Sequence, residues 1–176
     1  MDIWLILGFS LIIILLCVIV VGTSAVWPSL IGAPYVPTSK RTAQKMLELA
    51  QVSADDTVAD LGSGDGRIIM MAAEQFGANA FGIEADPLRV LWSRGVIRHR
   101  GLRKKVEVIW GNFFNQGLAK ATVVTVYQGQ EINKRLKDKF LLELKPGTRV
   151  VSYSFPFDGW TPVETRKNPH LYLYVI

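Results

Sequence analysis

The feature that most limits how this chain can fold is a glycine-rich loop between a short apolar strand and a helix. Residues 60–67 read Asp-Leu-Gly-Ser-Gly-Asp-Gly-Arg. The preceding residues, Thr57–Leu61, have the pattern of a buried strand, and Arg67–Phe76 has the pattern of a helix. Glycines in such a loop allow a tight turn and a close approach of backbone to ligand, beside the positive end of the helix. The stretch therefore predicts a ligand-binding turn at the edge of an α/β sheet.

The rest of the chain alternates strand and helix patterns. Further strands are expected at 78–84, 106–110, 122–127 and 148–155, and further helices at 38–51, 86–100 and 131–144. Asp86-Pro87 is typical of a helix N-cap followed by proline at the first helical position. Two final strand patterns, at 161–166 and 171–175, predict a C-terminal hairpin. The alternation predicts an α/β fold with a mainly parallel, doubly wound sheet.

The N-terminal segment has a different composition. Residues 3–27 contain no Asp, Glu, Lys or Arg, in a chain of 176 residues that has 20 basic and 15 acidic side chains. A helix over these residues would be about 37 Å long, and the hydrocarbon core of a membrane is roughly 30 Å thick. We therefore expect a transmembrane anchor at 1–27, a proline-containing link and first helix start at 28–44, and one globular domain at 45–176.

The flanks of this segment predict its orientation. Lys40, Arg41 and Lys45 follow it and no basic residue precedes it, so the domain is expected on the cytoplasmic side, or on the matrix side of a mitochondrial membrane. The alternative is a cleaved signal peptide, for which residues 23–25 offer small side chains but no basic leader is present. The expected localisation is a single-pass membrane protein, with the lipid bilayer as a partner.

The spacing of the glycines distinguishes between cofactor classes. The dinucleotide fingerprint requires a third glycine at the position of Arg67, and the phosphate-binding Gly-Lys-Thr/Ser sequence is absent. The pattern acid-x-Gly-x-Gly-x-Gly resembles the cofactor loop of seven-strand methyltransferases that use S-adenosylmethionine. The resemblance implies that Asp60 lies near the amino-acid end of the cofactor and that the loop lines its methionine and ribose through Gly62, Ser63, Gly64, Asp65 and Gly66. A purely structural strand-to-helix turn is the alternative.

Two positions beyond the loop support the same cofactor. Glu84 ends the second strand, where a carboxylate accepts hydrogen bonds from both ribose hydroxyls. An acid there is not expected to be buried without a partner. Asn112 follows the third strand, where related enzymes place a polar contact to the adenine edge, and Phe113 could pack on the ring. For Asn112 and Phe113 a turn residue and a core aromatic are the alternatives.

Three segments together extend the resemblance to most of the chain. They are Pro34-Tyr35-Val36-Pro37-Thr38, residues 60–67, and Phe155-Pro156-Phe157 with Trp160. The chain resembles the small seven-strand lysine methyltransferases with an N-terminal membrane segment, whose animal members modify the adenine nucleotide translocase and the c subunit of ATP synthase. This resemblance implies a Rossmann-like seven-strand domain and a lysine acceptor on a membrane-associated protein. Because no mitochondrial transit peptide is evident, a prokaryotic relative is expected.

Residues after the fourth strand narrow the methyl acceptor. The Asn/Asp-Pro-Pro-Tyr/Phe loop of enzymes that methylate planar amino groups is absent, and the only thiol, Cys17, lies in the apolar segment. Direct transfer to an amine, a hydroxyl or a carboxylate remains, for which alignment does most of the catalysis. Tyr127, which ends the strand, is the expected catalytic residue. Tyr35, Phe155 and Trp160 are further candidates on the acceptor side.

Other functions stay open at this point. The acceptor could be a membrane-soluble small molecule such as a quinone or lipid, or the domain could be a non-catalytic scaffold that binds the cofactor. Residues 87–105 contain seven Lys or Arg and no acid, which suits a solvated helix face or an anionic lipid surface better than nucleic acid. One cysteine and two histidines leave no disulfide and no metal-ligand spacing, so no metal is expected.

Overall fold

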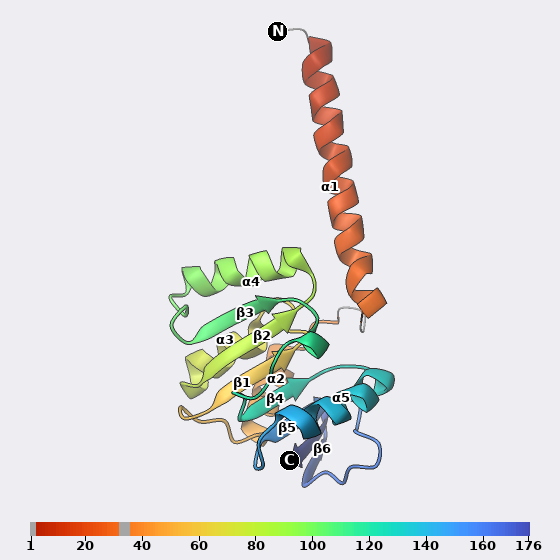
Figure 1. Cartoon of the computed structure of the whole chain (residues 1–176). Helices are drawn as coiled ribbons and strands as arrows, with labels where there is room; N and C mark the ends of the chain where they lie inside the picture. The colour runs from red at the N-terminus through yellow and green to blue at the C-terminus, as the bar shows by residue number, and fades with distance from the viewer. Residues whose placement is uncertain (1–2, 32–35) are drawn as a thin grey trace.

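The computed structural model describes residues 3–31 and 36–176, and within the first range it describes the side chains of residues 3–4, 6–16, 18–19 and 22. Helix α1, Ile3–Ile31, projects away from an α/β domain that contains all the other elements (Figure 1). Tyr35 and the Pro34 end of the predicted link lie outside the described residues.

The domain is a single seven-stranded sheet with helices between its strands. Its elements are, in chain order, α2 (Lys40–Leu49), β1 (Thr57–Leu61), α3 (Arg67–Phe76), β2 (Asn79–Glu84), α4 (Pro87–His99), β3 (Val106–Trp110), the 3₁₀ turn η1 (Phe113–Asn115), β4 (Val123–Val126), α5 (Gln130–Glu143), β5 (Arg149–Tyr153), β6 (Glu164–Lys167) and β7 (His170–Val175). The strand order is β3-β2-β1-β4-β5-β7-β6. The first five strands are parallel, and β7 pairs antiparallel with β5 and β6. The predicted parallel sheet and C-terminal hairpin are confirmed.

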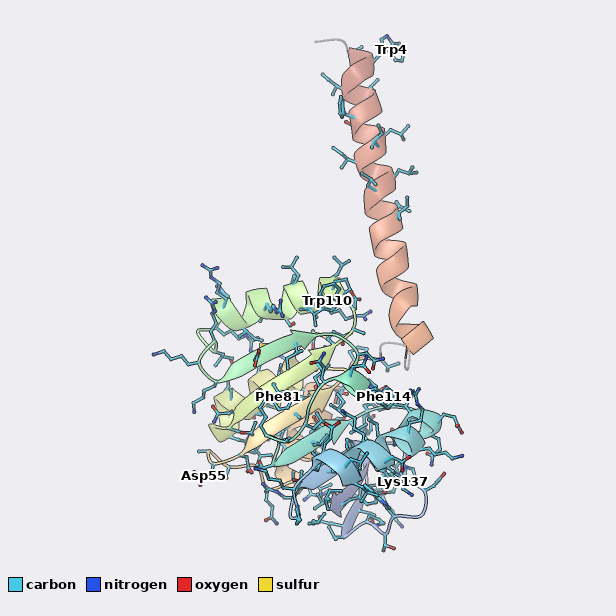
Figure 2. The ribbon with its side chains drawn as sticks, viewed as in Figure 1. Trp4, Asp55, Phe81, Trp110, Phe114 and Lys137 are labelled. Carbon is cyan, nitrogen blue, oxygen red and sulfur yellow. The ribbon has the colours of Figure 1, made fainter. Side chains whose placement is uncertain are left out.

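The two faces of the sheet have separate cores. One core joins α2, α3 and α4 to the sheet through residues such as Met46, Ile69 and Val90. The other joins α5 to the sheet through Leu136 and Phe140, with Phe81 of β2 in the same cluster (Figure 2). Both faces of the central strands are therefore covered, which explains the continuous apolar runs of β1 and β4.

Local capping chemistry fixes two helix starts near the C-terminal edge of the sheet. Ser39 caps α2, since its hydroxyl oxygen accepts from the Thr42 backbone N–H at 3.0 Å. Asp86 caps α4 by accepting from the Leu88 N–H at 2.9 Å, and Pro87 occupies the first helical position. The predicted Asp86-Pro87 helix start is confirmed.

One part of the predicted architecture is contradicted. Among the residues that the structure describes, no helix is both long and apolar enough to cross a membrane. The longest unbroken run of described side chains in α1 is 6–16, which at about 1.5 Å per residue covers about half of a roughly 30 Å hydrocarbon core. This finding overturns the expected transmembrane helix and the single-pass membrane localisation inferred from it.

Candidate functional site

The glycine loop turns at the C-terminal edge of β1, between that strand and α3 (Figure 1). Gly62, Gly64 and Gly66 all have left-handed backbone conformations, with φ of 80°, 56° and 79°. Glycine adopts this conformation without the steric cost that a Cβ would bring. The last of the three is also the N-cap of α3. The alternating glycines are therefore required by the path of the backbone.

The end of β2 holds this loop in place. The Ile83 carbonyl accepts from the N–H groups of Gly62 and Ser63, at 2.9 and 3.1 Å. The carboxylate of Glu84 accepts from the Gly64 N–H at 2.7 Å. A Cβ on Gly82 would lie 2.4 Å from the Ser63 side chain, so this strand glycine makes room for the loop. Sequence reasoning did not identify Gly82, although a glycine inside a strand commonly marks such a close approach.

Glu84 is held rigidly at the site. It is only 5% exposed, and its second oxygen accepts from the Asp86 N–H at 2.9 Å. The Arg89 guanidinium lies 3.0 Å from Asp86 and 4.0 Å from Glu84. The carboxylate is therefore fixed by backbone donors and faced by one cation, and each of its oxygens has a further lone pair with which to accept a ligand hydroxyl.

Asp60 is a buried acid beside the loop. The Thr125 hydroxyl donates to its Oδ1 at 2.7 Å. Burial raises the pKa of Asp60 to about 7, and the negative charges of Glu84 and Asp65 raise it further against the hydrogen bond from Thr125. Three carboxyl groups thus surround the loop, and the least solvated of them is poised to ionise when a cation binds.

Asp65 has a different role from the one that the resemblance implies. Its carboxylate accepts from the Arg67 guanidinium at 2.6 and 2.9 Å, and Arg67 also donates to the Thr38 carbonyl at 2.5 Å. Burial raises the pKa of Asp65, but the hydrogen bonds and charge of Arg67 outweigh it and hold the pKa below its usual value. Asp65 and Arg67 therefore tie the loop to the segment that precedes α2.

Two polar side chains complete the surroundings of the loop. Ser63 Oγ is buried and has no hydrogen-bond partner among the described residues. The Gln128 amide donates to the Leu61 carbonyl at 3.0 Å, and a Cβ on Gly62 would lie 2.6 Å from its nitrogen. Gln128 therefore lies against the loop from the end of β4. Sequence reasoning did not select it, because a glutamine after a strand carries no signal of burial.

Asn112 and Phe113 follow β3 as predicted but are already engaged. Asn112 Oδ1 accepts from the Phe114 N–H at 2.9 Å and so caps η1. Phe113 is buried in the core on the α5 side of the sheet, with its ring 4.8 Å from that of Phe114. Figure 2 places Phe114 between the sheet and α5, where Arg135 stacks 4.0 Å from its ring centroid. The core-aromatic alternative describes Phe113 in this structure.

The aromatic candidates divide into two groups. Tyr127 lies at the end of β4, with its ring centroid 4.3 Å from Tyr153 and 6.5 Å from Phe155. Trp160 instead packs against Phe157, 5.2 Å away, in the core on the α5 side. The structure therefore brings Tyr127 and Phe155 together with Tyr153, which sequence reasoning missed, and places Trp160 in a separate cluster.

The basic stretch at 87–105 is partly used inside the domain. Four of its side chains have internal partners: Arg89 pairs with Asp86, Arg94 donates to Val108, Arg100 pairs with Glu74, and Lys105 donates to Gly77. The other three, Arg98, Arg103 and Lys104, are exposed and have no ion-pair partner within the described part of the chain. They line an open groove beside the starts of β2 and β3, at the edge of the sheet opposite the glycine loop.

Comparison with known proteins agrees with this geometry. Residues 60–164 match the family model of the ANTKMT methyltransferase domain. A protein-lysine N-methyltransferase of Saccharolobus islandicus is 45% identical over 81% of this chain and 93% of its own length. The Mus musculus lysine N-methyltransferase named for the c subunit of ATP synthase is 31% identical over 86% of this chain, which spans 61% of the mouse protein. The crystal structure of an RNA methyltransferase from Salinibacter ruber in complex with S-adenosyl-L-homocysteine has a TM-score of 0.78 and 40% identity, over 80% of this chain and 94% of that one.

The fold, the glycine loop and these similarities define an S-adenosylmethionine-dependent methyltransferase. More specifically, the chain belongs to the ANTKMT methyltransferase domain family. The predicted enzyme class and cofactor are confirmed.

The residues around the loop fit this cofactor. S-adenosylmethionine carries a sulfonium and an α-ammonium group, and the loop presents the carboxyl groups of Asp60 and Glu84 to a cationic ligand. The unpartnered hydroxyl of Ser63 offers a further polar contact. A deeply buried carboxyl group with a pKa of about 7 gains most from a bound cation, because that cation replaces the water it has lost.

Proposed function

We propose that this methyltransferase transfers its methyl group to the side-chain amine of a lysine in another protein. The observation that carries the proposal is the aromatic group of Tyr127, Tyr153 and Phe155, which lies at the ends of β4 and β5 beside the strand that carries Asp60. The lysine-specific names of the relatives from Saccharolobus islandicus and Mus musculus support the same acceptor.

The division of labour among the residues follows from their chemistry. S-adenosylmethionine supplies an electrophilic methyl group on its sulfonium. Asp60 would orient the ammonium end of the cofactor, and Glu84 would accept hydrogen bonds from the ribose hydroxyls. A lysine attacks only in its neutral form, and an aromatic surface that excludes water lowers the pKa of the amine. Tyr127 would hold the amine in line, since its ring is fixed by stacking on Tyr153.

The narrower prediction, that the substrate protein is membrane-associated, draws support from the ATP synthase component in the name of the mouse relative. We test it together with the acceptor class. The full chain is incubated with methyl-labelled S-adenosylmethionine and either the membrane or the soluble fraction of cells, and label is then counted separately in protein, RNA and lipid. Label in a discrete protein band of the membrane fraction is the expected result.

A matched pair of variants ties the label to the site. Glu84→Gln keeps the size of the side chain but loses its charge, and should reduce labelling by at least about tenfold through weaker cofactor binding. Glu107→Gln changes an acid on neighbouring β3 that is 67% exposed, and should leave labelling unchanged. Label confined to RNA, the acceptor class named for the Salinibacter ruber neighbour, or confined to lipid would refute the lysine proposal.

A further inference from the structure

A second concave site lies at the same edge of the sheet as the acceptor side. It is a cavity of about 460 Å³ between the start of α2, the end of β5 and the turn that joins β6 to β7. These three segments lie far apart in the sequence and are brought together by the antiparallel pairing of β5 with β7. The residues that line it are Arg41, Thr42, Lys45, Tyr153, Ser154 and, from the hairpin, residues 167–170.

The lining of this cavity, which we call the hairpin pocket, is basic. Arg41, Lys45 and Lys167 contribute three positive charges, and none of the lining residues is acidic. The Lys45 ammonium donates to the Asn168 carbonyl at 2.8 Å and so joins α2 to the turn. Arg41 and Lys167 are exposed and have no ion-pair partner among residues 3–31 and 36–176. Two cations are therefore available to an anionic ligand.

The hairpin pocket shares a wall with the proposed acceptor site. The Tyr153 ring lines the pocket and stacks on Tyr127 with centroids 4.3 Å apart. The next residue, Ser154, has a left-handed φ of 66°, and its N–H donates to the His170 carbonyl at 2.9 Å. A non-glycine residue in this conformation is strained, and such strain is concentrated at functional sites. The chain thus bends at the point where the aromatic group meets the basic pocket.

We infer that the hairpin pocket binds an acidic side chain of the substrate protein, a few residues from the acceptor lysine. The inference rests on the proposed lysine acceptor and adds a sequence preference to it. Successive residues of an extended chain are about 3.3 Å apart, so a segment of a few residues would reach across the Tyr153 ring. A second copy of the chain is a poor occupant, because its net charge of +5 is also positive.

The test is a binding measurement on the full chain with S-adenosyl-L-homocysteine present. Two fluorescent peptides carry one central lysine each, flanked by glutamates in one and by glutamines in the other, and their dissociation constants are measured by anisotropy. The glutamate peptide should bind about fivefold more tightly at low salt, as two partly exposed ion pairs would provide. This preference should shrink as added salt screens the charges.

Two double variants with the same change in charge locate the effect. Arg41→Gln/Lys167→Gln should abolish the preference for the glutamate peptide and leave the affinity for the glutamine peptide unchanged. Arg103→Gln/Lys104→Gln removes one arginine and one lysine at the opposite edge of the sheet and should behave as the wild type. Equal binding of the two peptides by the wild type, or an equal loss in both variants, would overturn the inference.

Parallel methylation assays separate this inference from the proposed function. A glutamate preference without methylation of either peptide keeps the pocket assignment and counts against the lysine acceptor. Methylation of both peptides at equal rates and with equal binding keeps the acceptor and overturns the pocket. If single-stranded RNA displaces the glutamate peptide from the wild type but not from Arg41→Gln/Lys167→Gln, the pocket binds phosphate rather than a peptide carboxylate, and the inference fails.

Discussion

Replacing Asp60 by Asn should stabilise the protein while weakening its cofactor site. Burial holds the pKa of Asp60 at about 7, compared with 3.8 for an exposed carboxyl. A carboxyl whose pKa is raised by folding binds more protons in the folded than in the unfolded chain, so stability falls as pH rises from about 4 to about 7. Above pH 7 the folded state then carries the full cost of an ionised buried group.

The structure gives the size of this effect. A pKa difference of about three units corresponds to about 4 kcal/mol of unfolding free energy. Asn cannot ionise, and its oxygen can still accept from Thr125, although a weaker hydrogen bond loses about 1 kcal/mol. Asp60→Asn should therefore raise the free energy of unfolding by about 3 kcal/mol at pH 8. At pH 5, where the folded wild type is mostly protonated at Asp60, the gain should be below about 1 kcal/mol.

Denaturant unfolding of the full chain at pH 5 and pH 8 measures both values. The matched control is Asp56→Asn at a second buried aspartate. Burial raises the pKa of Asp56, but hydrogen bonds from Thr122 and Ser53 and the charge of Arg149 outweigh it and lower the pKa overall. Asp56 therefore stabilises the fold above its unfolded pKa, and its substitution should destabilise at pH 8. A lower stability of Asp60→Asn at pH 8, or an equal gain at both pH values, would refute the reasoning.

Calorimetry completes this prediction. Between pH 6 and 7.5 an α-amino group stays largely protonated, so the affinity of the wild type for S-adenosylmethionine should rise with pH as Asp60 ionises. The Asp60→Asn variant should bind at least about tenfold more weakly at pH 7.5, because a charge-assisted contact is lost, and its affinity should vary little with pH. An unchanged affinity would remove Asp60 from the cofactor site.

Three further substitutions test other parts of the site. Tyr127→Phe should lower the rate of methyl transfer by about tenfold without changing cofactor affinity, as one lost hydrogen bond to the acceptor would do; unaltered turnover would exclude that role. Gly82→Ala should lower the melting temperature and weaken cofactor binding, because its Cβ would lie 2.4 Å from the Ser63 side chain; a wild-type melting curve would contradict the tight packing. Arg67→Lys cannot bind the Thr38 carbonyl and the neighbouring acid in one plane, so protease cleavage before α2 should become faster, and an unchanged digestion pattern would show that the clamp is dispensable.

Most of the fold could be predicted because its signals are local. The apolar run of β1, the glycines that follow it and the Asp86-Pro87 cap all lie within a few residues of the structure that they specify. The turn η1, Phe113–Asn115, was missed because its cap depends on a single asparagine side chain. The transmembrane prediction relied on composition alone and was contradicted once the described residues were tested.

The site was less predictable because its contacts are distant in sequence. The Asp60 carboxyl meets Thr125, and the loop around Gly62 meets Gln128, across 65 residues or more. No periodic pattern encodes such pairs. The second residue of the stacked pair formed by Tyr127 and Tyr153 was likewise invisible, since only the pairing of β4 with β5 brings the two ring positions together. The resemblance to a family located the cofactor loop, and the partners of that loop required the structure.

The central claim is that the methyl acceptor is a lysine, and amino-acid analysis of the labelled product tests it most directly. Protein labelled by the full chain with methyl-labelled S-adenosylmethionine is hydrolysed completely, and the labelled amino acids are separated beside standards. The account predicts that the label elutes as methylated lysine and is absent when the Glu84→Gln variant replaces the wild type. Label in any other amino acid, or label recovered only as methylated nucleoside or lipid, would contradict it.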